Sequence, residues 1–366
     1  MDRGKRAALT AMASFFARRL SVLARLIAPG ARDLPEITDA DISAAAHIVE
    51  RQPYSRANLV FLRDKRILFD DACRGFVMYG VQARTWVALG DPVGPTECIA
   101  DLVRRFLDEC GAFGGVPVFY EVRESDLQVY RDCRLTSLKI GEEARVDLTS
   151  FALVGGRWSK QRQHLRRLER DGISFRVVRR GETAAIMGRL RQISDEWLTL
   201  KSGGEKRFSL GSFRPDYLSH FDVAVMERAG DILAFANLWT SSQRFEIATD
   251  LIRHCRSAPP ETMEALLLHA ITWGQSQGYR WFSLGVAPLA GVERSFAAPL
   301  WSRVGSFLYA HGETWYRFRG LRAFKAKFHP EWTPRYLVYP GGGTLPRIVA
   351  DVAALIAGGY RKVVLK

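Results

Sequence analysis

Residues 224–250 read AVMERAGDILAFANLWTSSQRFEIATD. Runs rich in β-branched and aromatic residues predict three strands here, at 224–227, 232–240 and 244–250. A helix over 260–277 follows, with Pro260 in its first turn, and then a strand over 281–286. Antiparallel strands followed by a helix and one more strand are typical of an α+β unit, and differ from the regular alternation of a doubly wound sheet.

The first half of the chain has the same order of elements. Its apolar runs predict strands at 75–80, 85–90 and 116–122, helices at 96–111 and 125–133, and a strand that ends at Leu148. The second half begins with a predicted helix over 159–171, a strand over 173–178 and a helix over 184–200, which precede the three strands quoted above. We therefore expect two copies of one α+β architecture. The predicted divisions are 1–34 (basic helix and linker), 35–150 and 151–340 (the two domains) and 341–366 (C-terminal amphipathic helix).

The charge of the chain indicates a polyanionic partner. Its 366 residues hold 53 Lys and Arg against 39 Asp and Glu, a formal net charge of +14. Nucleic acid and an anionic membrane surface are both candidates. No apolar run reaches about 18 residues, the length of a membrane-spanning helix. The five cysteines form no C-x-x-C pair, and neither H-E-x-x-H nor a phosphate-binding glycine loop occurs, so we expect no metal and no nucleotide cofactor.

Both ends of the chain are predicted to form amphipathic helices. Over residues 5–27 basic residues alternate with Leu, Met and Phe up to the Pro29-Gly30 breaker. This helix has three possible roles: to lie on a membrane surface, to act as a transit peptide, or to dock on the protein. A second amphipathic helix, over 345–360, has two possible roles: to lie on a lipid surface or to dock on the protein. Its apolar face alone does not distinguish between them.

A basic ridge is predicted on the helix over 159–171. Arg162, Arg166 and Arg170 recur every four residues and therefore share one side, with Lys160 and Arg167 at its edge. Guanidinium groups offer paired donors to phosphate, so the ridge suits phosphate contacts. A solvated surface is the alternative.

Two further groups are candidates for chemistry. Asp250 ends a predicted strand and Arg253 follows three residues later, so the pair could orient a nucleophile and hold an anion, or could be a structural ion pair. The segment 322–336 interleaves four cations with four aromatic residues, which suits either a nucleic-acid strand or a protein core.

Several long motifs together resemble a known family. They are Lys139-x-Gly-Glu-Glu-Ala-x-Val-Asp-Leu, Glu205-Lys-Arg-Phe-Ser-Leu-Gly, Asp250-x-x-Arg253 and Gly320-Leu-Arg-x-Phe-Lys-x-Lys-Phe-x-Pro-x-Trp-x-Pro-Arg-Tyr. In this order they are similar to the catalytic domain of the phosphatidylglycerol lysyltransferases, or multiple peptide resistance factors. The resemblance covers about residues 35 to 350. It implies tandem acyl-CoA N-acyltransferase-like domains related to the Fem transferases.

The resemblance also implies an activity. An aminoacyl group, lysine first and alanine second, would pass from aminoacyl-tRNA to a hydroxyl of phosphatidylglycerol at the cytoplasmic face of the bacterial inner membrane. The product changes membrane lipid charge and resistance to cationic antimicrobial peptides. Aminoacyl-tRNA is then a co-substrate and no cofactor is expected. Family members usually carry a transmembrane flippase block, so we expect this chain to be a catalytic fragment or a stand-alone synthase.

The resemblance implies roles for individual residues. Asp250 would orient or deprotonate the attacking hydroxyl or hold the aminoacyl ammonium, and Arg253 would bind the lipid phosphate. Lys325, together with Arg322 and Lys327, would act at the tRNA end. The remaining candidates, for lining the site, are Glu205, Ser209 and the ridge residues Arg162 and Arg166.

Three other classes remain as alternatives. An acetyl-CoA-dependent acetyltransferase would need a glycine-rich pyrophosphate loop, whereas this chain has Arg253-His-Cys-Arg-Ser-Ala-Pro-Pro, whose prolines lack N–H donors. A Fem-like transferase would use aminoacyl-tRNA with a peptidoglycan or peptide acceptor. A non-enzymatic nucleic-acid-binding module would explain the charge but leave Asp250 without a role.

Overall fold

The structure is a computed structural model that describes residues 34, 36–200, 205–290 and 320–360. The predicted N-terminal helix and the residues after Tyr360 lie outside this part of the chain. The strands are β1 (Arg66–Phe69), β2 (Phe76–Gln82), β3 (Thr85–Leu89), β4 (Val116–Arg123), β5 (Thr136–Asp147), β6 (Ile173–Val178), β7 (Asp222–Arg228), β8 (Asp231–Thr240), β9 (Glu246–His254), β10 (Trp281–Pro288) and β11 (Glu331–Tyr339).

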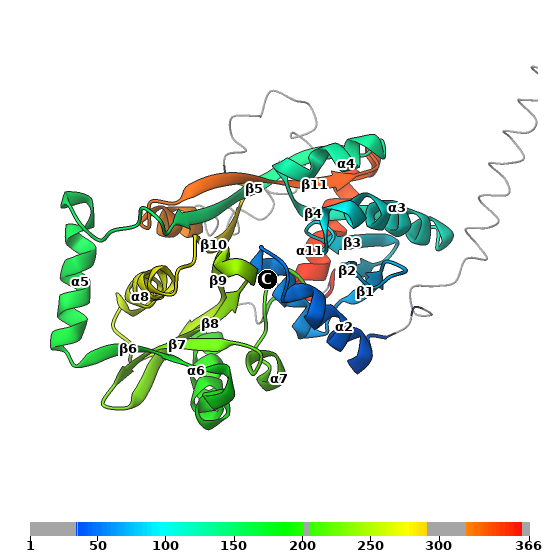
Figure 1. The fold of residues 1–366 in the computed structure, drawn as a ribbon. Coiled ribbons are helices and arrows are strands. Elements are labelled where there is room, and N and C mark those ends of the chain that lie inside the picture. The colour runs from blue at the N-terminus through cyan, green and yellow to red at the C-terminus, as the bar shows by residue number, and fades with distance from the viewer. Residues whose placement is uncertain (1–33, 35, 201–204, 291–319, 361–366) are drawn as a thin grey trace, which may run out of the picture.

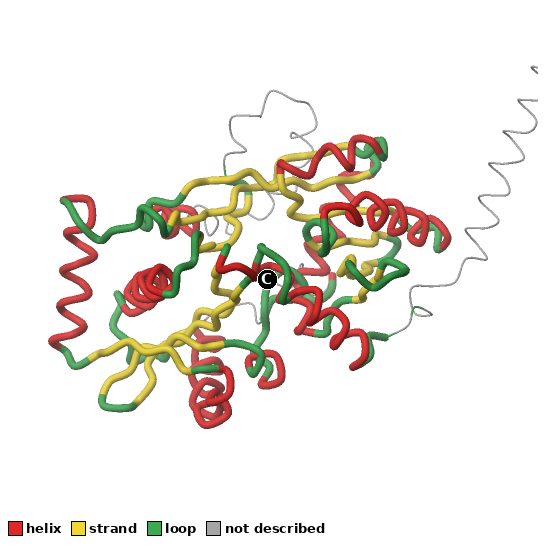
Figure 2. Tube along the Cα trace, in the orientation of Figure 1, coloured by secondary structure: helices red, strands yellow, loops and turns green. Residues whose placement is uncertain are grey.

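The strands form one sheet, and helices cover both of its faces. They are α2 (Asp39–Val49), α3 (Thr96–Ala112), α4 (Leu127–Asp132), α5 (Ser159–Arg170), α6 (Met187–Leu200), α7 (Pro215–Leu218), α8 (Thr262–Ser276) and α11 (Leu345–Ala357). Residues 320–326 form a further helix, and η2 (Ser55–Leu62) is a 3₁₀ helix. In Figure 1 and Figure 2, α6 and α8 lie on opposite sides of strands β7 and β8.

The described strands form one sheet in the order β1-β2-β3-β4-β11-β5-β10-β9-β8-β7-β6. Two neighbouring pairs are parallel, β3 with β4 and β9 with β10, and the other pairs are antiparallel. Each parallel pair is joined by one helix, α3 in the first half and α8 in the second. The predicted α+β fold with two related halves is therefore confirmed.

β11 lies between two strands of the first half. It pairs with β4 on one side and β5 on the other, although the sequence places it with the second domain. The division near residue 150 thus falls within a continuous sheet, and the domain boundaries stay a prediction. Neither β1 nor β11 was predicted. For β11 the reason is that segment 331–339 shows no alternation of apolar and polar residues.

Strand alternation divides the core into two clusters. On β2, Val77 and Tyr79 pack with Phe106 of α3, whereas Phe76 and Met78 point to the other face. That second face also holds the buried side chains of α11, among them Ile348. Because β2 is covered on both sides, its sequence is a continuous apolar run.

The C-terminal helix α11 docks on the protein. Its residues Leu345, Ile348 and Val352 are buried, and α11 contacts β2 and β3. The buried carboxylate of Asp351 accepts a hydrogen bond from the Thr85 hydroxyl. Docking is therefore the correct alternative for the helical part 345–357.

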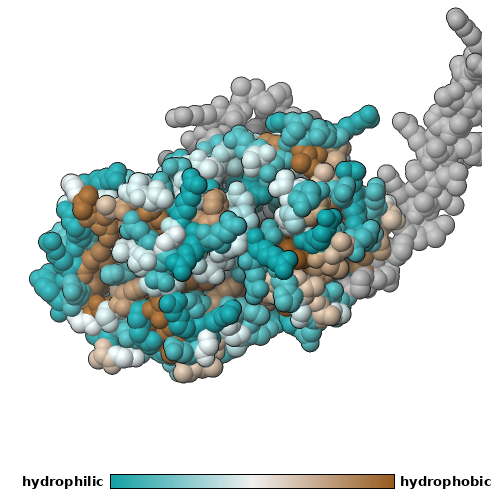
Figure 3. Space-filling view, viewed as in Figure 1, coloured by the Kyte–Doolittle hydropathy of each residue, from teal (hydrophilic) through white to brown (hydrophobic). Residues whose placement is uncertain are grey.

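On the face drawn in Figure 3, apolar side chains lie in patches between polar ones.

Irregular pairing marks the centre of the sheet. On β9, Ile252 pairs with Ala236 and Thr249 pairs with Leu238, so β9 has one more residue than β8 between these pairs. The extra residue shifts the alternation and allows Asp250 and Arg253 to face the same side. A second bulge lies on β10 between Ser283 and Val286. The prediction that Asp250 ends its strand is wrong, since β9 continues to His254.

Candidate active site

Asp250 lies in the β9 bulge and is held by two donors. Its Oδ1 accepts the backbone N–H of Gly211 at 2.8 Å, and its Oδ2 accepts the Tyr217 hydroxyl at 2.7 Å. Trp239 in turn donates its indole N–H to the Tyr217 oxygen at 3.0 Å. Burial raises the pKa of Asp250, and the hydrogen bonds from Gly211 and Tyr217 oppose that rise. The carboxylate is thus oriented and is more basic than an ordinary aspartate.

The segment 205–213 packs directly against Asp250. A Cβ added to Gly211 would lie 1.7 Å from Oδ2 of Asp250, so only glycine permits this approach. The Asp64 carboxylate holds the same segment by accepting the N–H of Phe208 at 3.0 Å. The Glu205–Gly211 motif therefore forms one wall of the site.

Arg253 is buried and its guanidinium binds protein groups. It is 3 % exposed, donates to Ser194 Oγ, and donates to Glu205 Oε1 at 2.6 Å. Glu205 then accepts the backbone N–H of Phe213 at 2.9 Å. These contacts favour a role in positioning the segment 205–213 over the expected binding of a lipid phosphate.

The variant Arg253→Lys tests this positioning role. The single ammonium nitrogen of a lysine cannot occupy the positions of both guanidinium nitrogens that donate to Ser194 and Glu205. We therefore expect the free energy of unfolding to fall by about 1–2 kcal/mol. Chemical denaturation of both proteins measures this difference. Unchanged stability would show that the contacts of Arg253 do not hold the segment.

Lys325 lies over the bulge of β10. This side chain is 7 % exposed and donates to the carbonyl of Val286 at 2.8 Å. Burial lowers its pKa from 10.5 to about 8, against the opposing field of Glu143 and Glu121. The amine can therefore both give and take a proton near neutral pH.

Sequence reasoning missed three charged residues, Arg56, Glu121 and Glu143, which together are called the charged centre below. Arg56 of η2 forms an ion pair with the buried Glu121. Glu121 has φ +69°, an unusual conformation for a residue with a side chain, at the point where the β4–β11 register shifts. Glu143 of β5 accepts hydrogen bonds from Ser283 and Arg335. The positive charge of Arg56 also opposes the rise in the pKa of Asp250 and adds to the lowering of the pKa of Lys325.

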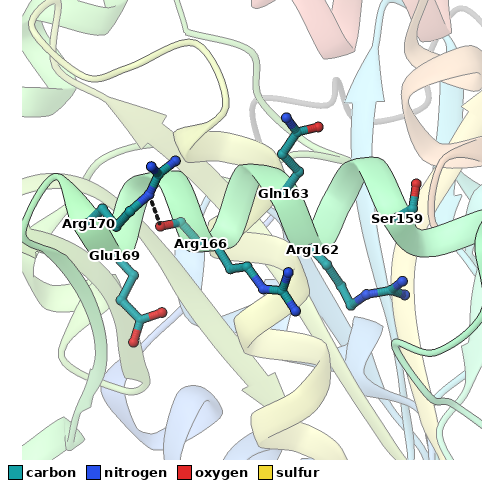
Figure 4. Close-up of a pocket in the computed structure, with 6 residues that line it drawn as sticks. All are labelled: Ser159, Arg162, Gln163, Arg166, Glu169 and Arg170. Atoms are coloured by element: carbon teal, nitrogen blue, oxygen red, sulfur yellow. Dashed lines mark hydrogen bonds between the residues drawn. The ribbon is translucent and has the colours of Figure 1, made fainter.

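A second site is the groove along α5 (Figure 4). Its volume is about 690 Å³, and it is lined by Ser159, Arg162, Gln163, Arg166, Glu169 and Arg170. Arg162 and Arg166 point to the same side of the helix in Figure 4. Arg162 donates to the carbonyls of Leu153 and Gly155, whereas Arg166 is exposed. Two residues of the predicted ridge, Arg162 and Arg166, thus share one side of α5, whereas Arg170 turns back and donates to the Arg166 carbonyl at 3.4 Å. Of the two assigned residues, Arg166 is the better placed to meet a ligand.

Comparison with known proteins identifies the family. The family described as "Phosphatidylglycerol lysyltransferase, C-terminal" matches residues 46–339. The chain belongs to this family.

The matches to curated relatives of the family cover most of this chain. The phosphatidylglycerol lysyltransferase of Bacillus subtilis is 38 % identical over 314 residues, which are 85 % of this chain and 36 % of the relative. That of Staphylococcus aureus is 31 % identical over 301 residues, 82 % of this chain and 36 % of the relative. The chain thus spans about a third of the length of these relatives.

Two solved structures have the same fold at a TM-score of 0.80. One is a C-terminal domain from Agrobacterium fabrum named for a candidate lysylphosphatidylglycerol synthetase, 42 % identical, covering 88 % of this chain and 98 % of that one. The other is L-PGS from Bacillus licheniformis, 33 % identical, covering 89 % and 100 %. FemX, at 8 % identity and a TM-score of 0.51 over 87 % of this chain and 100 % of its own, shares the fold.

The remaining residues assigned through the family motifs lie at several places. Ser209 is buried within the segment 205–213. Arg322 lies over the Trp332 ring at 4.6 Å and contacts Glu142 at 3.3 Å, and Lys327 pairs with Glu264 at 2.7 Å. The segment 205–213 therefore brings Asp250, Arg253 and Glu205 together. The pKa of Lys325 responds to the charges of Glu143, Glu121 and Arg56, and the α5 arginines form a separate surface.

Two searches for other site types were negative over the described residues. Across 36–200, 205–290 and 320–360, no three His, Cys, Asp or Glu side chains are arranged to hold a metal ion. Within the same part of the chain, none of the helices combines the length and apolar character needed to cross a bilayer.

Proposed function

We propose that this chain transfers an amino acid, lysine in preference to alanine, from aminoacyl-tRNA to a glycerol hydroxyl of phosphatidylglycerol. The observation that carries the proposal is the oriented, buried Asp250 at a bulge in a chain of this family. The reaction takes place at the cytoplasmic face of the bacterial inner membrane, to which the protein binds peripherally. A transmembrane flippase domain is the expected partner for moving the product.

The chemistry is a transesterification. The glycerol hydroxyl oxygen attacks the aminoacyl carbonyl carbon, and the ester bond to the terminal ribose of the tRNA breaks. Asp250 takes the proton of the attacking hydroxyl, and the Lys325 ammonium gives a proton to the departing ribose oxygen. A proton then returns from Asp250 to Lys325 through solvent. Since the ester is already activated, positioning and charge stabilisation supply much of the catalysis.

Arg56 is the best candidate to hold the lipid phosphate or the carbonyl oxygen. Its side chain is 27 % exposed, in contrast to the buried Arg253, and its positive charge lowers the pKa of both Asp250 and Lys325. A guanidinium at this place offers paired donors to an anion as charge develops. We therefore assign this role to Arg56, and assign Arg253 to positioning.

The direct test is a transfer assay with labelled substrate. Purified protein is incubated with phosphatidylglycerol vesicles and tRNA charged with labelled lysine or alanine. Label in the extracted lipid is the expected result. A parallel reaction with a peptidoglycan peptide as acceptor tests the Fem-like alternative, which shares the fold. Label in the peptide and none in the lipid would overturn the proposal.

The groove along α5 is proposed to contact the phosphates of the tRNA acceptor end. We expect Arg166→Gln to weaken tRNA binding and to lower the slope of log affinity against log salt by about one phosphate contact. Binding titrations at several salt concentrations measure this slope. An unchanged slope would show that Arg166 belongs to a solvated surface.

A further inference from the structure

Phe208 has an unusual backbone conformation in the wall of the candidate site. Its φ is +64°, in the left-handed region that bulky residues rarely adopt, and its side chain is buried. Such a conformation costs free energy and persists only where the surrounding structure holds it. Three residues further along, Gly211 donates its N–H to Asp250 at 2.8 Å. The groups that hold Phe208 therefore bear on the orientation of the Asp250 carboxylate.

Asp64 and Lys65 hold Phe208 through two kinds of contact. Both residues follow η2 in the first half of the chain. Asp64 Oδ2 accepts the N–H of Phe208 at 3.0 Å, and Asp64 Oδ1 pairs with Lys65 Nζ at 2.5 Å. Lys65 Nζ also lies 6.0 Å from the centre of the Phe208 ring, within the range of a cation–π contact. The pair thus contacts both the backbone and the ring of this strained residue.

The ammonium of Lys65 lies inside the protein. Its side chain is 1 % exposed, and besides pairing with Asp64 it donates to the carbonyl of Leu59 at 3.1 Å. Burial lowers the pKa of Lys65, and the negative charges of Asp64 and Asp250 oppose that fall. A buried ion pair is often no more stabilising than apolar side chains of similar volume. Stability alone therefore does not account for the pair, which favours a role in the geometry and charge of the site.

The segment 205–213 is also held on either side of Phe208. Arg207 donates its N–H to the carbonyl of Ile356 in α11 at 2.9 Å, and Phe213 donates its N–H to Glu205. Asp64 ties the middle of the segment to the first half of the chain, three residues before Gly211. A change at Asp64 is therefore transmitted along a short length of backbone to the donor of Asp250.

These contacts form a chain that ends at Asp250. Resting on the function proposed above, we propose that Asp64 and Lys65 are positioning residues for the aminoacyl transfer. They hold Phe208 in its left-handed conformation, and this fixes the place from which Gly211 donates to Asp250. Displacement of a reacting group by about 1 Å can cost on the order of 10²-fold in rate, so a small movement of this wall is enough to lower turnover.

Lys65 also contributes to the balance of charge around Asp250. Burial raises the pKa of Asp250, and four groups oppose this rise: the Gly211 N–H, the Tyr217 hydroxyl and the positive charges of Lys65 and Arg56. Loss of the Lys65 charge should therefore raise the pKa of Asp250 further.

Two substitutions of Asp64 test its positioning role. Asp64→Ala removes the acceptor for the Phe208 N–H, so we expect kcat for lipid aminoacylation to fall by about 10-fold or more, with little change in KM for either substrate. Asp64→Asn keeps an oxygen that can accept this N–H, and is expected to restore most of the lost kcat. The matched control is Asp70→Ala. Asp70 also lies in the first half, next to the edge strand β1, and accepts the backbone N–H groups of Arg74 and Gly75 at 2.6 and 2.8 Å. This control should lose stability and keep kcat.

Hydrogen exchange of the segment 205–213 is a second measurement, which needs no turnover. We expect the Gly211 amide to exchange faster in Asp64→Ala than in the unmodified protein, because its hydrogen bond to Asp250 is no longer held in place. In Asp70→Ala the exchange at Gly211 should stay unchanged.

Lys65→Met tests the contribution of the charge. Methionine has a similar length and no charge, so the substitution raises the pKa of Asp250. Since transfer requires the Asp250 carboxylate to be deprotonated, the acid side of the pH–rate profile should move to higher pH, with activity at alkaline pH largely kept. A loss of stability alone, as in Asp70→Ala, would not move it.

The results that would overturn the positioning role differ from those that would overturn the proposed function. Unchanged kcat in Asp64→Ala with an unmoved acid side in Lys65→Met, or equal losses in both Asp64 variants with unchanged exchange at Gly211, would overturn the positioning role and leave the function intact. Should Asp64→Ala fail to fold, Lys65→Met decides the question through its pH–rate profile and its exchange at Gly211. Absence of labelled lipid with the unmodified protein and every charged tRNA would overturn the proposed function itself.

Discussion

Asp250→Asn is expected to lower aminoacyl transfer to phosphatidylglycerol by about 10²–10⁴-fold, the usual contribution of a general base. The amide cannot accept the proton of the attacking hydroxyl. It has nearly the same size as the carboxylate, and its oxygen can still accept the N–H of Gly211. The fold should therefore survive, and thermal unfolding of both proteins checks this. Full activity in the variant would remove Asp250 from the mechanism.

Tyr217→Phe is the matched control for Asp250→Asn. It keeps the carboxylate but removes the donor at 2.7 Å that stabilises the charged form. Burial already raises the pKa of Asp250, so losing this donor raises the pKa further. Activity requires the carboxylate to be deprotonated. The acid side of the pH–rate profile should therefore move to higher pH, while activity at alkaline pH is largely kept.

Lys325→Met is expected to have opposite effects on activity and stability. The variant loses the proton donor for the departing ribose oxygen, so we expect transfer to fall by about 10²-fold or more. It also removes an ammonium that is only 7 % exposed, so we expect the variant to be more stable than the unmodified protein. Burial lowers the pKa of Lys325 from 10.5 to about 8, which corresponds to a cost of about 3 kcal/mol for the charged form.

The sign of the pH dependence follows from this pKa. Below pH 8 the lysine is protonated in both the folded and the unfolded state, and the fold carries the full cost. Between pH 8 and 10.5 the unfolded chain holds the proton and the folded protein does not. The free energy of unfolding of the unmodified protein should thus rise with pH across this window by about 3 kcal/mol relative to Lys325→Met. A flat difference between the two proteins would contradict the assignment.

Local sequence patterns were sufficient for most of the elements. The strand over 173–178 and the helix beginning at Ser159 agree with β6 and α5, because alternating and 3.6-residue patterns depend on neighbours in the chain. The helix expected from 260 begins at Thr262, and the one expected from 184 is a 3₁₀ turn followed by α6. Such boundaries are set by capping and packing.

The charged centre shows what local patterns cannot predict. Arg56, Glu121 and Glu143 come from three separate elements of the first half, whereas Asp250 and Lys325 come from the second. None of the first three has a local signature, although Glu143 lies within a motif that carried the family resemblance. Their meeting depends on the insertion of β11 between β4 and β5.

The sequence by itself determined the family, the α+β class and the basic ridge on α5, because each depends on residue type and spacing along the chain. The tertiary structure alone decided which charges meet. The bulge in β9 turns Asp250 toward Gly211 and Tyr217, and burial against Ser194 and Glu205 gives Arg253 a positioning role. The pKa values of Asp250 and Lys325 differ from those of free side chains because desolvation arises only when distant segments pack together.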